Sequence, residues 1–188
     1  NRNSSRQNLN LKIIDNLLKA INKNELKSII SLGSQAEYGK KLKPINENSK
    51  TIPITRYGKI KIKVLKKIKN YCQKNRIRFV WLRIFTGYGP GSDKSWLINY
   101  TILKLINKQN LKFTSGNQIY NFIYVTDIVT AIIKSIYSNR ACGIFNLGHD
   151  KSYTIKHIVK LIFKKIKIVE KPIFGDLNYR KDQVMNFL

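Results

Sequence analysis

A tyrosine and a lysine lie four residues apart in the segment YGKIK, which Tyr57 opens and Lys61 closes. On a helix this spacing places both side chains on one face, so the phenol and the ammonium group would be neighbours. A free tyrosine loses its proton at about pH 10, and a nearby cation favours the phenolate and lowers that pKa. We therefore expect Tyr57 to exchange a proton with a substrate hydroxyl while a hydride moves to or from the adjacent carbon.

Ser34 offers a third group for the same chemistry. It follows the apolar run at residues 28–32, which predicts a short buried strand. Its hydroxyl would then lie at the C-terminal end of a parallel strand, where such sheets build their sites, and could bind the same substrate oxygen. The Tyr-x-x-x-Lys spacing also has a simpler interpretation as a surface helix pattern, because this lysine-rich chain repeats it at Tyr100 and Lys104.

The apolar pattern around these residues alternates between helical stretches and short β-like runs. The helical stretches cover residues 10–21, 56–74, 96–106, 127–136 and 154–163. The β-like runs cover residues 28–32, 79–85, 122–124 and 144–146. This alternation predicts an α/β fold in which helices cover a parallel sheet, and the glycine-rich residues 87–91 are predicted to form a loop.

The length and composition indicate a globular chain. Its 188 residues, 43% of them hydrophobic, can bury the core of one domain or of one domain with a small lobe. We find no apolar run of about 18 residues and no signal-like leader, so we expect no membrane association and a cytoplasmic protein. Cys72 and Cys142 lack CxxC spacing, and His149 and His157 are isolated, so we expect neither a disulfide framework nor a metal site.

The formal net charge of +26 would by itself indicate a nucleic-acid or polyanion partner. The excess is lysine rather than arginine, is spread along the chain, and accompanies many isoleucines and asparagines, which A/T-rich codons encode. Codon bias is therefore the simpler interpretation. A basic polyanion-binding module stays a second function class, although the chain lacks a helix-turn-helix, RNP or zinc pattern, and we do not expect nucleic acid to be the partner.

Six segments resemble, in the right order, motifs of one enzyme family. They are NLKIIDNLLKA (10–20), SLGSQAEYG (31–39), YGKIK (57–61), LRIFTGYGP (82–90), NFIYVTD (121–127) and IFNLG (144–148). Together they resemble the extended short-chain dehydrogenase/reductases, and within them the NAD-dependent epimerase/dehydratase group that acts on nucleotide sugars.

The resemblance implies a Rossmann-like doubly wound parallel sheet that is incomplete, with its early strands missing, and a small C-terminal substrate-binding lobe. Residues 1–90 and parts of 111–148 would form the C-terminal half of the NAD(P)-binding domain. Residues 91–110 and 149–188 would form the lobe. The helices near residues 10–22 and 56–74 would form the interface of a homodimer in the full-length protein.

The same resemblance implies a role for each site residue. Ser34 would hold the C4 oxygen of the sugar, Tyr57 would be the acid/base, and Lys61 would bind the nicotinamide ribose and lower the tyrosine pKa. Phe85 and Asn10 would lie near the cofactor, NAD or NADP.

Two further residues would contact the nucleotide sugar. Thr86 stands where the family usually has an asparagine that meets the diphosphate, and Tyr120 stands where an arginine is often found. Arg180 resembles a C-terminal family arginine that contacts the nucleotide, and it would supply a charge-assisted pairing with phosphate. A solvated charge in a basic tail is the alternative interpretation of Arg180.

The chain lacks the glycine-rich turn that seats a dinucleotide pyrophosphate between a strand and a helix. Its first residue is Asn1 and its one methionine is Met185, so we expect an N-terminally truncated chain that binds NAD or NADP poorly. A truncated remnant without catalytic activity remains a third interpretation.

The residues after Ser34 bear on the reaction. Gln35 and Ala36 stand where 4,6-dehydratases of the family carry an Asp-Glu pair, and enzymes that epimerise C3 and C5 have a cysteine in place of Ala36. The resemblance therefore favours a C4 epimerase or a 4-ketoreductase of surface-polysaccharide sugar biosynthesis over a dehydratase. We expect Glu37 on an exposed turn, or in contact with the substrate.

Overall fold

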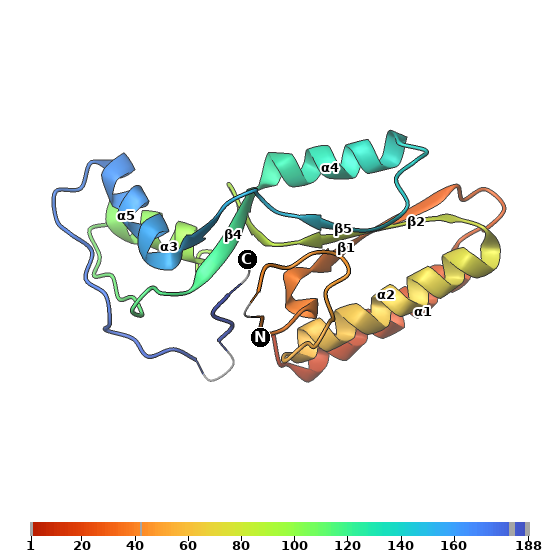
Figure 1. Cartoon of the computed structure of the whole chain (residues 1–188), viewed down its shortest axis with the longest axis horizontal. Helices are drawn as coiled ribbons and strands as arrows, with labels where there is room; N and C mark the ends of the chain where they lie inside the picture. Colours follow the sequence, from red (N-terminus) through yellow and green to blue (C-terminus); the bar gives the residue numbers. More distant parts are fainter. Residues whose placement is uncertain (1, 42, 181–182, 187–188) are drawn as a thin grey trace.

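The computed structural model describes residues 2–41, 43–180 and 183–186, and these residues build two small sheets (Figure 1). The first sheet contains three parallel strands in the order β1 (Ser28–Ser34), β2 (Arg78–Ile84) and β5 (Gly143–Leu147). Ser34 pairs with Ile84, and Ile84 pairs with Leu147. The three strands therefore end level with one another, and the segments that follow them begin at the same end of the sheet.

Helices cover both faces of this sheet (Figure 1). On one face, α1 (Leu9–Ala20) and α2 (Arg56–Asn75) lie side by side, and α4 (Val125–Tyr137) crosses the other face. This layering confirms the predicted α/β class and its parallel sheet.

The buried stripe of α2 forms the first core together with β2. The apolar side chains that the sequence pattern placed on one helix face are all buried there: Ile60, Val64, Ile68 and Cys72. They pack against Phe79 and Trp81, which point to the α2 side of β2. Burial of this stripe, at helical spacing, is what fixes α2 on the sheet.

The second sheet has a mixed topology. Its strands are β3 (Thr86–Tyr88), β4 (Ile119–Tyr124) and β6 (Ser152–Thr154), with β3 parallel and β6 antiparallel to β4. β3 and β6 were not predicted, because a strand of three residues shows no apolar period. The predicted loop at residues 87–91 is wrong for residues 87 and 88, which belong to β3.

A second core lies against this sheet. The helices α3 (Leu97–Ile106) and α5 (Ile155–Ile166) supply it together with β4, and its buried members include Phe113, Phe122 and Val159. None of the described helices is both long and apolar enough to cross a membrane, and the described residues contain no cluster of three or more potential metal ligands.

Candidate active site

Ser34 ends β1 and caps the short 3-10 helix η2 (Gln35–Glu37). Its hydroxyl oxygen accepts a hydrogen bond from the Ala36 backbone N–H at 3.2 Å. In return, the Glu37 carboxylate accepts a hydrogen bond from the Ser34 backbone N–H at 2.8 Å. This reciprocal capping box fixes both the backbone and the side chain of Ser34.

The first turn of α2 brings Tyr57 to this serine. Thr55 begins the helix, and its hydroxyl oxygen accepts from the Gly58 N–H at 3.2 Å. Gly58 is buried against η2, where a Cβ would lie 2.3 Å from the Ala36 carbonyl oxygen. Only a glycine at this position lets the helix approach the serine turn so closely.

The phenol of Tyr57 is half-buried beside Ser34. Burial raises the pKa of Tyr57, a hydrogen bond with the Ser34 side chain and the charge of Arg2 lower it, and Glu37 raises it again. The net shift is upward. The expected lowering of this pKa is therefore wrong for the chain as it stands, because desolvation of the phenolate outweighs the Ser34 hydrogen bond and the charge of Arg2.

Lys61 lies one helical turn after Tyr57. Its Nζ is 5.7 Å from the centroid of the Tyr57 ring and donates a hydrogen bond to the Leu32 carbonyl oxygen at 2.7 Å. Burial lowers the pKa of Lys61, and the charge of Glu37 acts in the opposite direction. The predicted proximity of the phenol and the ammonium group is confirmed, but the ammonium group stands over the ring and bonds to β1.

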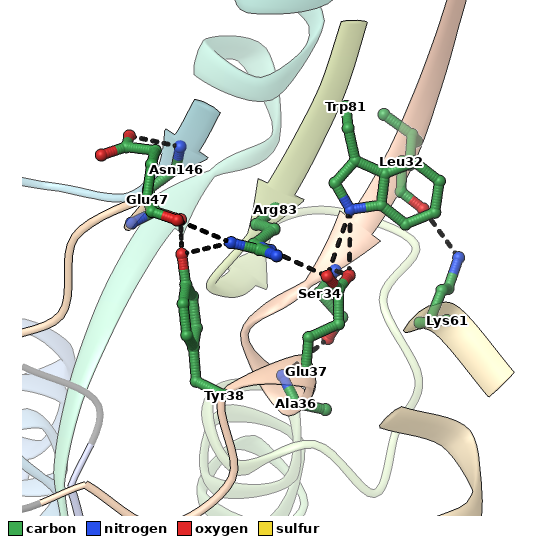
Figure 2. A network of polar contacts seen from close by, with 10 residues as sticks. All are labelled: Leu32, Ser34, Ala36, Glu37, Tyr38, Glu47, Lys61, Trp81, Arg83 and Asn146. Atoms are coloured by element: carbon green, nitrogen blue, oxygen red, sulfur yellow. Dashed lines mark hydrogen bonds and ion pairs between the residues drawn. The ribbon is translucent and has the colours of Figure 1, made fainter. Parts of the chain in front are cut away.

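A buried polar network lies behind Ser34 (Figure 2). Glu37 is fully buried and pairs with Arg83 of β2, Nε to Oε2, at 2.8 Å. The Trp81 indole N–H also donates to the Glu37 carboxylate, at 3.1 Å to Oε1. Both expectations for Glu37, an exposed turn and a substrate contact, are therefore wrong, because the side chain points into the protein.

This network was not predicted from the sequence. One signal in the sequence points to the network: Phe79, Trp81 and Arg83 alternate along β2 and therefore share one face of the strand. An arginine on the same face as buried aromatic residues needs a buried partner for its charge.

The residues predicted to contact the diphosphate or the cofactor do not all lie near the serine turn. Thr86 lies close to the serine turn, since its hydroxyl oxygen accepts from the Gln35 side-chain amide at 3.2 Å. The side-chain amide oxygen of Gln35, Oε1, is buried without a hydrogen-bond partner among the described residues. Phe85 is buried with Tyr38 in a small cluster of its own. Asn10 is exposed on the first turn of α1.

Arg180 is exposed and lies near the serine turn. Together with Arg2 and Tyr120 it lines a small cavity that also touches Ala36 and Thr55. The two guanidinium groups lower the pKa of Tyr120, although burial raises it by more. Arg2, which the sequence analysis did not single out, is held here because its carbonyl accepts from the Tyr57 N–H at 2.9 Å.

These residues fit the reacting end of a nicotinamide dinucleotide but not its pyrophosphate. Two helices follow a strand directly, α4 after Tyr124 and α5 after Thr154, and neither junction contains a glycine. The glycine-rich residues 87–91 lead instead into a loop before α3. In the part of the chain that the structure describes, no glycine turn leads directly from a strand into the first turn of a helix.

The comparison with known proteins decides the family. A profile of the NAD dependent epimerase/dehydratase family matches residues 2–148. The chain belongs to this family. The family is NAD-dependent by its own description, so the chain is a member of an NAD-dependent enzyme family with a Rossmann-like fold.

Two curated relatives of this family member illustrate the range of its similarity. One is an uncharacterized UDP-glucose epimerase of Bacillus subtilis, YtcB, which is 26% identical over 155 residues that cover 81% of this chain and 49% of the relative. The other is a CDP-abequose synthase of Yersinia pseudotuberculosis, 26% identical over 185 residues that cover 94% of this chain and 60% of the relative.

The fold matches solved members of the same group. A UDP-N-acetylglucosamine 4-epimerase from Methanobrevibacter ruminantium superimposes with a TM-score of 0.88 at 26% identity, and the match covers 97% of this chain and 60% of that one. The chain thus spans about half to three fifths of the length of these relatives.

Proposed function

We propose that the chain is the substrate-side half of an NAD(P)-dependent nucleotide-sugar enzyme that acts at C4 of the sugar, as a C4 epimerase or a 4-ketoreductase. The observation that carries the proposal is the convergence of Ser34, Tyr57 and Lys61 at the C-terminal end of β1. The names of the relatives, which include 4-epimerases and CDP-abequose synthases, support a place in surface-polysaccharide sugar biosynthesis.

Each residue of the trio has a distinct task in this proposal. Burial raises the pKa of Tyr57, which keeps its phenol protonated at neutral pH. When a 4-keto sugar is reduced, the phenol donates this proton to the C4 oxygen, and in the oxidation half of an epimerisation the phenolate takes up the proton of the C4 hydroxyl. The Ser34 hydroxyl binds the same oxygen and orients it. The Lys61 ammonium group, 5.7 Å from the ring centroid, stabilises the phenolate that remains. The nicotinamide cofactor, when bound, supplies the hydride chemistry at C4.

The residues after Ser34 argue against a 4,6-dehydratase. Elimination of water needs an additional acid and base, and Gln35 and Ala36 supply neither. Both are buried, and the Gln35 amide is already bound to Thr86.

A nucleotide diphosphate fits the cationic side of the site. Arg2 and Arg180 flank Tyr120 and stand next to the serine turn, so their guanidinium groups can pair with phosphate oxygens. We assign the substrate lobe to residues 91–110 and 149–188, of which the structure describes 91–110, 149–180 and 183–186. We assign the described residues of 1–90 and parts of 111–148 to the cofactor-binding half.

We further propose that a segment outside this chain seats the pyrophosphate of NAD or NADP. β1 pairs with β2 alone among the described strands, and Leu32 of β1 is 38% exposed. Beside it, α4 exposes an apolar stripe of Val129, Ile133 and Ile136. A strand, glycine turn and helix packed here would extend the sheet and cover this stripe.

The deciding experiment compares the complete reading frame with this chain. The complete protein should convert a UDP-, CDP- or dTDP-linked sugar at C4 in the presence of NAD or NADPH. Its Tyr57→Phe variant should lose turnover and still bind the nucleotide sugar, and retained turnover would sink the assignment. The 188-residue chain alone should bind NAD and NADP weakly. Micromolar affinity would overturn the proposal that a segment outside this chain seats the pyrophosphate.

Two alternatives remain as outcomes of this experiment. A stop codon directly upstream, with no turnover, would indicate a catalytically inactive remnant. Salt-sensitive affinity for unrelated DNA, tighter than for nucleotide sugars, would instead favour the polyanion-binding module that the charge of +26 suggests.

A further inference from the structure

Glu37 is a fully buried carboxylate three residues after Ser34. A charge removed from water is stable only when it is paired and hydrogen-bonded. Glu37 meets this demand with donors from two strands: the Ser34 backbone N–H at 2.8 Å, the Trp81 indole N–H at 3.1 Å and the Arg83 Nε at 2.8 Å.

The two donors from β2 hold the carboxylate in one place. Trp81 and Arg83 are 0% and 3% exposed, and the Arg83 guanidinium is itself held because its Nη1 donates to the Tyr38 hydroxyl at 2.7 Å. That hydroxyl in turn donates to the Asn146 side-chain oxygen of β5 at 2.7 Å. The chain of contacts therefore connects all three strands of the first sheet to one carboxylate (Figure 2).

The backbone is shaped to receive this carboxylate. A Cβ at Gly33 would lie 2.1 Å from the Trp81 Nε1 and 2.6 Å from the Glu37 Oε1. The glycine immediately before Ser34 thus leaves open the space in which Glu37 meets Trp81.

The contact with Glu37 limits which hydrogen-bonding groups of Ser34 remain available. With its N–H bound to Glu37 and its oxygen accepting from Ala36, the serine keeps one hydroxyl proton and one lone pair for other partners. Because the backbone is fixed, the hydroxyl is held beside the Tyr57 phenol, and its hydrogen bond with that phenol lowers the Tyr57 pKa.

We infer that Glu37 is a positioning residue of this site: its buried carboxylate anchors the Ser34 backbone to β2 and so directs the Ser34 hydroxyl at Tyr57. Glu37 itself touches no substrate, since it is fully buried. The inference rests on the proposed role of the Ser34 and Tyr57 pair, but it concerns the geometry of that pair and not turnover.

The test measures how strongly Ser34 acts on Tyr57 in the 188-residue chain, with and without Glu37. The reporter is the 13Cζ chemical shift of Tyr57 at neutral pH in tyrosine-labelled protein, assigned with Tyr57→Phe. Ser34→Ala should move this resonance in the native background, because it removes the hydroxyl beside the phenol. In a Glu37→Gln background the same substitution should leave the resonance where it is.

A purely structural role predicts a different result. If Glu37 only stabilises the fold, Ser34→Ala will move the Tyr57 resonance equally in both backgrounds, and the inference fails. Glu47→Gln is the matched control at the outer end of the network, where its carboxylate accepts from the Asn146 N–H at 2.8 Å. The Ser34→Ala shift should persist in that background, and its loss there would also overturn a special role for Glu37.

Two measurements keep the inference testable if Glu37→Gln does not fold. Glu37→Asp retains the charge but retracts the carboxylate from Ser34, and it should abolish the Ser34→Ala shift as well. In the native chain, the Ser34 amide should be protected from hydrogen exchange, and exchange as fast as that of an exposed loop amide would overturn the inference. Since neither readout needs turnover, an inactive full-length enzyme would count against the proposed function alone.

Discussion

Gly58 in the first turn of α2 lies directly against the backbone carbonyl of Ala36, so that a Cβ at Gly58 would lie 2.3 Å from that oxygen. The same Cβ would lie 2.9 Å from the Cβ of Pro53. This contact joins the helix that carries Tyr57 to the turn that carries Ser34. The distance between the Ser34 and Tyr57 side chains therefore depends on a residue that has no side chain.

Gly58→Ala should destabilise the protein, although alanine is the better helix former. The backbone carbonyl of Ala36 cannot rotate away as a flexible side chain could, so the added methyl must push the helix from the turn. We expect a loss of about 1 to 3 kcal/mol in the free energy of unfolding, measured with urea. Lys59→Ala, at the exposed neighbouring position, should change it by less than about 0.5 kcal/mol. A stabilised Gly58→Ala variant would contradict the close contact.

Thr55→Ala should weaken the start of α2. The Thr55 hydroxyl accepts from the Gly58 N–H at 3.2 Å and is buried, so alanine would leave that N–H without its capping oxygen. The expected loss is about 1 kcal/mol in the free energy of unfolding. Thr55→Ser keeps the capping oxygen and should retain most of the stability. An equal loss in both variants would mean that the methyl group, and not the cap, is what matters.

The buried Cys72 thiol should make the free energy of unfolding fall as the pH rises from about 9 toward 11. Burial raises the pKa of the Cys72 thiol from its ordinary 9.0 to about 11. In this window the unfolded chain has lost the thiol proton while the folded chain keeps it, so unfolding is favoured as the pH rises. Urea unfolding at a series of pH values measures the effect, and Cys72→Val should flatten the curve between pH 9 and pH 10.

Buried tyrosines also titrate at high pH, so the native chain and Cys72→Val are compared only between pH 9 and pH 10. Burial also raises the pKa values of Tyr38, Tyr57 and Tyr120 above 10.0, so their contribution to the stability is lost only at higher pH. Cys142→Ser should leave most of the loss between pH 9 and pH 10 in place, because burial is the larger cause of the raised Cys72 pKa and the charge of the exposed Cys142 is the smaller one. If Cys142→Ser flattens the curve and Cys72→Val does not, the assignment to Cys72 is wrong.

A homodimer through α1 is the expectation for the full-length protein. Leu9, Ile13 and Leu17 lie at helical spacing and are 53%, 60% and 51% exposed. Sedimentation velocity of the full-length protein should give a dimer, and Ile13→Asp should shift it to a monomer. Lys19→Gln, exposed on another face of α1, changes the net charge by the same amount and should leave the dimer intact. A monomer in the native protein would remove the proposal.

Local patterns in the sequence were enough to predict most elements of the fold. The apolar periods of α2 and α5 correspond to faces that the structure buries, since an amphipathic helix turns its apolar face to the core, whereas α1 and α4 leave part of their apolar stripes exposed. The spacing of Tyr57 and Lys61 predicted their proximity for the same reason, because side chains four residues apart share a helix face.

What the sequence could not determine is the environment of these groups. A residue's type and neighbours along the chain do not report how much water surrounds it, so the direction of the Tyr57 pKa and the burial of Glu37 both depend on long-range packing. Glu37 finds Arg83 across 46 positions of sequence, and Lys61 finds the Leu32 carbonyl across 29. The sequence by itself determined which chemical groups the site contains and on which elements they lie. Only the tertiary structure decided which of them face one another and which are withdrawn from water, because those contacts form when separate elements pack.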